Sequence, residues 1–447
     1  MRLKRNLSLF LILLLSCFSV LYAQDTDEHV LNHRIELDFN ILNTVDYYGN
    51  LYIRFHAFLP SVLTFVNNDG SVTVCTSDDS AKVTWIYEFG MDLTEQKRFS
   101  IPNEHSMLGA FTKDNEGNYY IFYAGRATKT TDENMIIAKY DQNGEKVNTF
   151  KMQANPRDGF STVKIPFDAG TCRLEISGSM LAVYFAHERF DGHQASFGFI
   201  IDKDSFTRID KGHAYYYQNG TYPKNNNLLP FTGHSFNQFI LPIENGFLIA
   251  DHGDAYPRAF TFGKFQNGSS TIRLNAFKFP GNIGANATYA EMGGLVKTSD
   301  GFLFFGSYGT NANNARNIFI LTMDENLSRC SNPVYITKYT RNDGHAGHPK
   351  IVSINDGRYI ILWEFFSFST QAANIVAGTS TGYISTFALI IDENGDAVSE
   401  IQEYKGIRLN INDTLRYNPH NGAVYWAIND TSKSITVYGL DVRKIIK

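Results

Sequence analysis

The sequence predicts an all-β protein, and three features support this prediction. Its 447 residues include 35 Gly, 25 Tyr and 35 Phe, and 19% of them are charged. Abundant aromatic and turn-forming residues favour many short strands joined by tight turns. No stretch shows the sustained 3.6-residue apolar period of an amphipathic helix. A third feature, a recurring hairpin pattern, specifies the architecture further.

The hairpin pattern consists of an alternating apolar segment, a tight turn with glycine and a second apolar segment. Asp-Gly and Asn-Gly turns between alternating strands indicate β-hairpins, because such turns require positive φ angles. In several repeats a second turn follows, and it ends another apolar segment. Each repeat is therefore expected to contain four short antiparallel strands. The repeats centre on Gly70, Gly117, Gly178, Gly246, Gly301, Gly357 and Gly422.

Seven repeats of four strands are typical of a seven-bladed β-propeller, whose radial arrangement protects the strand edges. The last repeat ends with residues 434–442 and leaves almost no chain for a fourth strand. An N-terminal strand at residues 33–39 is predicted to supply it and to close the ring. A pair of β-sandwiches is the alternative, and the regular spacing of the turns disfavours it.

Residues 1–23 resemble a signal peptide, with a basic start, a short apolar stretch at residues 7–15 and a cleavage position after Ala23. Residues 24–447 are expected to form one propeller domain, secreted to the extracellular space or the periplasm. Residues 14–17 also resemble a bacterial lipobox, and this alternative would anchor the protein by a lipid on Cys17. No later stretch has the length of a transmembrane helix.

The charge and the cysteines exclude some classes of protein. The net charge of −5 becomes more negative once the basic signal is removed, which argues against nucleic acid as a partner. Cys75, Cys172 and Cys330 are widely spaced and form no disulfide framework. A monomer is expected.

The propeller prediction brings histidines to one face, at the mouth of the central channel. Three of them lie 12 residues before a hairpin glycine, at His105, His234 and His345. Loops between the second and third strands of a blade would add His187, His193 and His252. The alternative for the first three is a structural role in hydrogen bonding between blades. Other polar residues expected to bind a ligand at this mouth are Glu188, Asp191, Arg316 and Glu364.

Residues 251–258 hold the densest polar cluster, directly after an apolar strand. His252, Tyr256 and Arg258 of this loop, together with His234, are the candidate catalytic residues. Asp251 and Asp254 are also plausible turn residues. The long loop at residues 365–383 is expected to be a lid or a ligand wall. Candidate sugar-stacking aromatics are Tyr215, Tyr216, Tyr217, Tyr289 and residues 365–368.

The composition offers ligands for one cofactor, a divalent metal. His187, His193, His345 and His348 are candidate ligands, and Asp251 or Asp254 could complete a site for Zn, Mn or Ca.

No nucleophile elbow, phosphate loop or zinc-protease motif occurs in the chain. The first hypothesis is therefore a binding protein that presents a His-, Tyr- and Arg-rich mouth to a glycan or to another extracellular ligand, such as a protein. The alternative is a polysaccharide lyase acting by β-elimination on a uronic-acid polymer, in which His234 or His252, Tyr256 and Arg258 match the base, acid and carboxylate-neutralising roles in type. In architecture and residue types the chain resembles secreted propeller polysaccharide lyases. A glycoside hydrolase with two carboxylates ranks behind the lyase.

Overall fold

The computed structural model describes residues 28–41, 62–78, 80–156, 162–168, 170–214, 229–230, 234–285, 288–311, 314–369 and 382–446. The expectations for the signal peptide, for Cys17, for Tyr215–Tyr217 and for most of the loop at residues 365–383 lie outside these residues. Within them, no helix is long and apolar enough to cross a membrane. The described cysteines Cys75, Cys172 and Cys330 form no disulfide.

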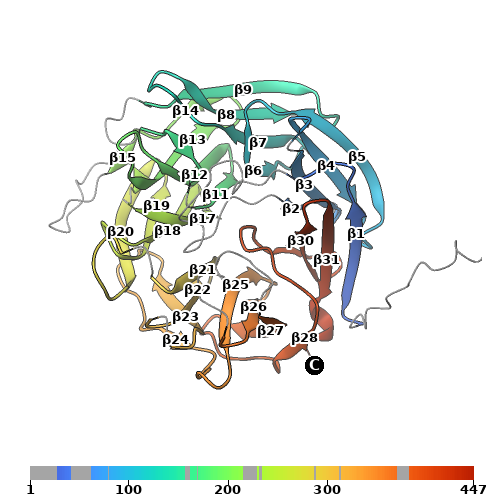
Figure 1. Cartoon of the computed structure of the whole chain (residues 1–447), viewed down its shortest axis with the longest axis vertical. Coiled ribbons are helices and arrows are strands. Elements are labelled where there is room, and N and C mark those ends of the chain that lie inside the picture. Colours follow the sequence, from blue (N-terminus) through green and yellow to red (C-terminus); the bar gives the residue numbers. More distant parts are fainter. Residues whose placement is uncertain are drawn as a thin grey trace, which may run out of the picture.

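Seven antiparallel sheets are arranged in a ring around a central axis, which confirms the predicted seven-bladed β-propeller and excludes the β-sandwich alternative (Figure 1). Six sheets have four strands each, and the third blade has five because its innermost strand is interrupted. The innermost strand of each blade contacts that of the next blade around the ring.

The strands follow the blades in chain order. Blade 1 contains β2 (Val62–Val66), β3 (Val72–Asp78), β4 (Val83–Phe89) and β5 (Glu95–Pro102); blade 2 contains β6 (Met107–Lys113), β7 (Tyr119–Ala124), β8 (Glu133–Tyr140) and β9 (Lys146–Gln153). Blade 3 contains β10 (Ile165–Pro166), β11 (Cys172–Ser177), β12 (Met180–Glu188), β13 (Gln194–Asp202) and β14 (Thr207–Arg208); blade 4 contains β17 (Ser235–Ile243), β18 (Gly246–Gly253), β19 (Ala259–Gln266) and β20 (Ser269–Lys278). Blade 5 contains β21 (Ala290–Lys297), β22 (Gly301–Tyr308), β23 (Asn317–Asp324) and β24 (Val334–Tyr335); blade 6 contains β25 (His345–Ser353), β26 (Arg358–Phe366), β27 (Tyr383–Asp392) and β28 (Gln402–Tyr404). Blade 7 contains β29 (Arg416–Asn418), β30 (Ala423–Thr431), β31 (Ser434–Asp441) and β1 (Val30–Glu36); a parallel pair, β15 (His213–Ala214) and β16 (Leu229–Pro230), and a 3₁₀ turn, η2 (Val442–Lys444), complete the elements.

The ring closes through the N-terminal strand, as the sequence predicts. β1 pairs antiparallel with β31 from Val30 opposite Leu440 to Glu36 opposite Ser434. It thereby becomes the outermost strand of blade 7, beside the first blade in Figure 1. The strand begins and ends three residues earlier than the segment predicted from the apolar pattern.

The hairpin glycines serve two different purposes. Gly70 and Gly117 adopt φ angles of 84°, as the turn prediction requires. Gly246 instead begins β18, where a Cβ atom would lie 2.0 Å from the backbone oxygen of Phe265. The positive φ of that turn belongs to Asn245. Glycine is therefore needed there for close approach of two strands rather than for the turn itself.

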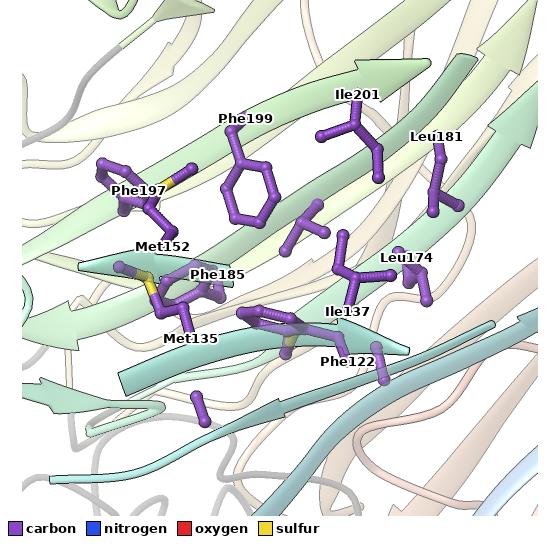
Figure 2. Close-up of a cluster of buried hydrophobic side chains, with 14 of the residues drawn as sticks. Phe122, Met135, Ile137, Met152, Leu174, Leu181, Phe185, Phe197, Phe199 and Ile201 are labelled. Carbon is purple, nitrogen blue, oxygen red and sulfur yellow. The ribbon is translucent and has the colours of Figure 1, made fainter. Parts of the chain in front are cut away.

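The hydrophobic core is divided among the interfaces between neighbouring blades. Figure 2 shows the cluster between blades 2 and 3, where Phe122, Phe185 and Phe199 pack around Leu174 and Met135. Equivalent buried clusters lie between every other pair of adjacent blades. Because each blade buries apolar side chains on both sides, the ring is stabilised without disulfides.

Loops on one side of the ring are called here the top face. They comprise the connections between the second and third strands of each blade and those between one blade and the next. The short hairpin turns lie on the opposite, bottom face. Every histidine that the sequence assigns to the candidate site belongs to the top half of the ring.

Candidate functional site

Three polar side chains from neighbouring segments meet on the top face of blades 3 and 4, and we call them the His-Asp cluster. His193 ends the loop between β12 and β13, His234 directly precedes β17, and Asp254 begins the loop after β18. The backbone N–H of His234 donates to the oxygen of Gln194 at 2.6 Å, and that of Asp254 donates to the oxygen of His234 at 3.1 Å. Backbone bonds thus fix the segments that carry all three side chains.

The three side chains of the cluster lie at increasing depth, from His193 at the surface to Asp254 in the interior. The His193 and His234 rings are 5.5 Å apart, and Nδ1 of His234 lies 3.5 Å from a carboxylate oxygen of Asp254. The side chain of His193 is 61% exposed and that of His234 is 24% exposed, whereas that of Asp254 is fully buried. His234 is therefore the group through which Asp254 can act on a ligand.

Burial sets the protonation of this cluster. Desolvation raises the pKa of Asp254 to about 7, and the positive charge of Arg258 only partly opposes it. Desolvation, followed by the neighbouring His193, lowers the pKa of His234. Apart from its own backbone, no described residue donates a hydrogen bond to the Asp254 carboxyl group. Both groups therefore favour their neutral forms near neutral pH, where a proton can move between them at little cost.

Tyr256 and Arg258 belong to the same loop, but only Tyr256 is accessible to a ligand. Nε of Arg258 donates to the oxygen of Pro280 at 3.0 Å, and Nη1 donates to that of Ala285 at 2.5 Å. Arg258 thus ties the loop to the segment after β20, a structural role. Tyr256 is half-buried beside it, with a φ angle of 52°. Tyr256 remains the aromatic ring of this loop that a ligand can reach.

His252 lies in the core and not at the mouth. Its ring packs against Phe236, Phe260 and Phe279, and Nε2 lies 2.8 Å from the hydroxyl oxygen of Thr288. Burial lowers its pKa to about 3, so the imidazole stays neutral. The candidate catalytic role of His252 has no support in this geometry, because the aromatic rings separate it from the surface.

The remaining histidines predicted at the mouth occupy separate surroundings. His105 is half-buried over Gly125, and the N–H of Ser106 donates to its Nδ1 at 2.8 Å. His187 is fully buried between Phe185 and Phe197. Among the acidic candidates, Asp191 pairs with His193 at 3.4 Å, and Glu188 pairs with Lys164 at 3.0 Å. Asp191 alone of these four adjoins the His-Asp cluster.

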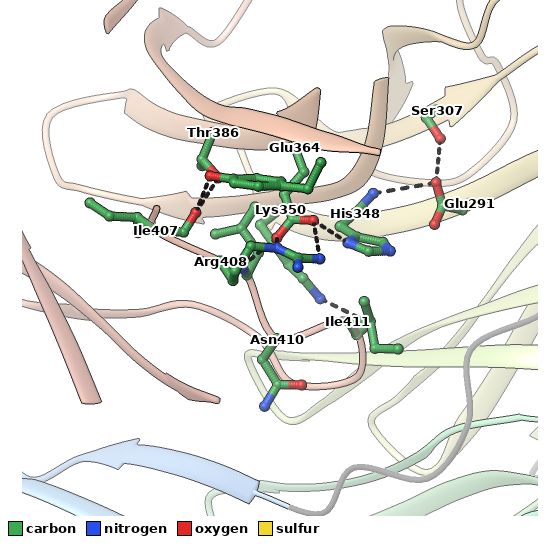
Figure 3. Close-up of polar contacts among 12 residues, drawn as sticks. Glu291, Ser307, His348, Lys350, Glu364, Thr386, Ile407, Arg408, Asn410 and Ile411 are labelled. Atoms are coloured by element: carbon green, nitrogen blue, oxygen red, sulfur yellow. Dashed lines mark hydrogen bonds and ion pairs between the residues drawn. The ribbon is translucent and has the colours of Figure 1, made fainter. Parts of the chain in front are cut away.

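A second polar network joins blades 5, 6 and 7 around Glu364 (Figure 3). The buried Glu364 carboxylate accepts from Nδ1 of His348 at 2.7 Å and from two nitrogens of Arg408 at 2.8 and 3.0 Å. These partners, together with the charge of His348, lower the pKa of Glu364 to about 2 against the effect of burial. Arg316 pairs with Glu291 at 3.0 Å. Glu364 and Arg316 are consequently engaged by protein groups.

His345 lies at the upper end of β25, between this network and the surface. Its ring stacks on Phe368 with centroids 4.7 Å apart, and its Nδ1 accepts from the backbone N–H of Arg316 at 3.2 Å. Burial lowers its pKa. This contact orders the first residues of the long loop that follows β26.

No metal centre arises from the described residues, which contain no group of three His, Cys, Asp or Glu side chains placed to hold an ion. His187 and His193 belong to blade 3, whereas His345 and His348 belong to blade 6. The geometry of these four candidates therefore gives no support to a shared divalent metal.

The structure adds an axial hub, defined as residues 408–414, which sequence reasoning did not identify. Asn410 donates to the backbone oxygens of Val62 at 2.9 Å and Ala427 at 2.8 Å. Lys350 donates to the oxygens of Ile411 at 3.2 Å and Asp413 at 2.7 Å, and Arg173 donates to that of Asn412. Blades 1, 3, 6 and 7 are thereby joined across the axis. A lysine in the middle of a predicted inner strand, such as Lys350, was the available signal.

The fold and the site define a seven-bladed propeller with a titratable cluster on its top face. No protein-family model matches the sequence, and no curated protein matches it significantly. Similar solved structures include an ulvan lyase of family PL25 (TM-score 0.43, 12% identity, 74% of this chain and 79% of that chain). An α-L-arabinofuranosidase from Fusarium graminearum gives a TM-score of 0.39 and 8% identity over 87% of this chain and 94% of that chain. A DUF4221 family member from Bacteroides vulgatus gives a TM-score of 0.40 and 9% identity, over 91% of this chain and 97% of that chain. All three TM-scores lie below 0.5, and the fold of this chain is established by its own sheet topology.

Proposed function

We propose that this protein is a secreted or lipid-anchored propeller that binds a glycan on its top face, over His193, His234 and Tyr256. The His-Asp cluster is the single observation that carries this proposal. It combines two flat rings that solvent reaches with a buried carboxyl group whose pKa is raised to about 7. A few placed polar groups beside aromatic surfaces suit a ligand made of rings and hydroxyl groups.

Structural constraints favour a rigid binding site. The segments of His193, His234 and Asp254 are bonded through their backbones, and Arg258 fixes the adjoining loop. A preformed site loses little conformational entropy on binding. Ligand recognition thus needs no rearrangement of the ring.

The test is a glycan array probed with the wild type and with two variants. The double variant His193→Ala/His234→Ala should lose its array signals, because both exposed rings are removed. His420→Ala is the matched control, since His420 lies in the bottom-face turn of blade 7 and contacts the oxygen of Asn68. Equal array signals for all three proteins, or no signal for the wild type, would refute the proposal.

A second candidate function is proton transfer during β-elimination on a uronic-acid polymer. The pairing of His234 with a carboxyl group whose pKa is about 7 favours it, because general acid-base groups work best near the ambient pH. His234 would exchange the proton with substrate, and Asp254 would act as a positioning residue. Arg258, whose guanidinium holds backbone oxygens, would not neutralise the substrate carboxylate.

Ultraviolet absorbance of the unsaturated sugar product tests this second function. Wild-type protein incubated with uronic-acid polymers should generate that absorbance, and His234→Ala should abolish it. His252→Phe should retain it, because His252 is enclosed by aromatic rings. Glycan binding without any unsaturated product would support the binding function and contradict the lyase function.

A further inference from the structure

A pocket of about 430 Å³ opens on the bottom face between blades 1 and 2, and we call it the amide pocket. Its walls are the β2–β3 turn, the β6–β7 turn, the β8–β9 turn and the start of β5. None of the residues predicted for the top-face site lines it. The side-chain amides that line the pocket are those of Asn67, Asn68, Gln96, Asn115, Gln142 and Asn143.

The floor of the amide pocket is polar because the innermost strand of blade 2 ends in a lysine. Nζ of Lys113 lies 3.2 Å from Oε1 of Glu88 and 4.5 Å from the centre of the Tyr119 ring. The hydroxyl of Tyr119 donates to the same Oε1 at 2.5 Å. Oε2 of Glu88 accepts no hydrogen bond from any residue that the structure describes. One carboxylate oxygen of the floor is therefore left for a ligand.

Hydrogen bonds between blades hold the walls of the pocket in place. Nδ2 of Asn68 donates to Oδ1 of Asn115 at 3.0 Å and so joins the hairpin turns of blades 1 and 2. Nζ of Lys97 donates to the backbone oxygen of Gln142 at 2.9 Å and joins the outer strand of blade 1 to the β8–β9 turn. The pocket is preformed, so a ligand loses little affinity to ordering of the protein.

Gln96 belongs to the pocket because of a β-bulge. The pairing of β4 with β5 shifts register between Glu88 and Phe89, and Gln96 is the extra residue. Bulges redirect a side chain and are frequent beside functional sites. Within the described part of the chain, the side-chain amides of Gln96 and Gln142 make no hydrogen bond. Two amide groups of the pocket are thus available to a ligand.

The amide pocket carries charges of both signs. Carboxylates outnumber ammonium groups by four to two among the described lining residues, so an acidic ligand is repelled. Hydroxyl groups both donate and accept, and can therefore bond carboxylates, amides and an ammonium group at once. The charged lining residues are Asp69, Glu88, Asp114, Glu116, Lys97 and Lys113.

We propose that the amide pocket binds a neutral sugar, with hydroxyl groups on the amides of Gln96 and Gln142 and on the Glu88 carboxylate. The volume of the pocket lies within the range of small-molecule sites. The ring of Tyr119 is only 1% exposed, so hydrogen bonds rather than stacking select the ligand. This site lies on the face opposite the His-Asp cluster and does not depend on the glycan binding proposed there.

The experiment is a calorimetric titration with four neutral disaccharides, maltose, cellobiose, lactose and α-1,4-galactobiose, and with α-1,4-digalacturonate as the acidic counterpart of the last. The protein is His193→Ala/His234→Ala, so that the top-face site does not contribute. At least one neutral disaccharide should bind, about tenfold or more tightly than digalacturonate, and added salt should leave its affinity unchanged. Adding Gln96→Ala/Gln142→Ala should weaken its binding about tenfold, because two hydrogen bonds are lost.

Asn394→Ala in the same background is the matched control and should bind like the parent. Asn394 is an exposed amide in the β27–β28 turn of blade 6, where Gly395 bonds Asp392 as Gly144 bonds Asp141 in blade 2. Absence of binding by every neutral disaccharide, tighter binding of digalacturonate, or affinity that survives Gln96→Ala/Gln142→Ala would overturn the amide pocket. These results leave the top-face site untouched, because the glycan array tests that site separately.

Discussion

Asp254 and His234 show how burial converts two ordinary side chains into a titrating pair. The Asp254 carboxyl group is fully buried, so its pKa rises to about 7, while the pKa of His234 falls for the same reason. The folded state therefore binds a proton on Asp254 that the unfolded state releases above about pH 4. Stability contributed by this group falls as the pH rises from about 4 to about 7 and is constant above that range.

Asp254→Asn should remove this pH dependence while keeping the shape of the side chain. Relative to the wild type, the variant should gain on the order of 3 kcal/mol in unfolding free energy between pH 4 and pH 7. Urea unfolding of both proteins at several pH values measures the difference. His234 and His252 contribute a pH dependence of opposite sign in both proteins. Subtracting one unfolding free energy from the other removes that contribution. A constant difference across that range would contradict the assigned pKa of Asp254.

At the scale of elements, the closing strand β1 is the contact that makes the ring continuous. Its residues differ in burial: Ile35 is 5% exposed within the cluster shared by blades 7 and 1, whereas Leu31 is 52% exposed. A charge at the buried position has no partner and must be desolvated.

Ile35→Asp should therefore lower the unfolding free energy by about 3 kcal/mol or more, whereas Leu31→Asp in the same strand should change it by less than about 1 kcal/mol. Thermal unfolding followed by circular dichroism measures both variants. Similar losses for the two variants would mean that β1 does not pack against the ring as described.

The elements also show what could be predicted from the sequence. Alternation and turn residues are local signals, so the repeats predicted the blades and the closing strand. The side chains at the ends of strands could not be assigned in this way, because the alternation of a strand stops where the loop begins. His252 and Asp254 are both polar residues near the end of β18, yet one packs among phenylalanines and the other lies beneath His234. Only the packing of neighbouring blades decides between these outcomes.

At the scale of the whole molecule, the axial hub joins blade 3 to blades 1, 6 and 7, none of which is its neighbour in the ring. Lys350 on blade 6 is the buried cation that holds two of its carbonyl groups. Burial, and after it the charge of Arg173, lowers the pKa of Lys350 to about 7, while Asp413, Glu291 and Glu364 act in the opposite direction. Between about pH 7 and pH 10 the unfolded chain binds the proton more strongly, so stability from this group rises with pH.

Lys350→Met should preserve the apolar stem and remove the ammonium group. The stability advantage of the wild type over this variant should therefore increase between pH 7 and pH 10. Lys113→Met is the comparison: burial also lowers the pKa of Lys113, but its ion pair with Glu88 at 3.2 Å opposes this, so its stability difference should increase less with pH. Chemical unfolding at several pH values distinguishes the two. A pH-independent difference for Lys350→Met would contradict a nearly neutral Lys350.

The top-face site is tested most directly by the imidazole signals of the whole protein. Protein labelled with carbon-13 at the histidine Cε1 positions is titrated with the tightest glycan from the array, and the signals are followed by NMR. The account predicts that the His193 and His234 signals shift together with the bound fraction, while those of His252 and His420 stay in place. A shift at His420, or saturation of binding without any change at His193 and His234, would show that the glycan binds elsewhere.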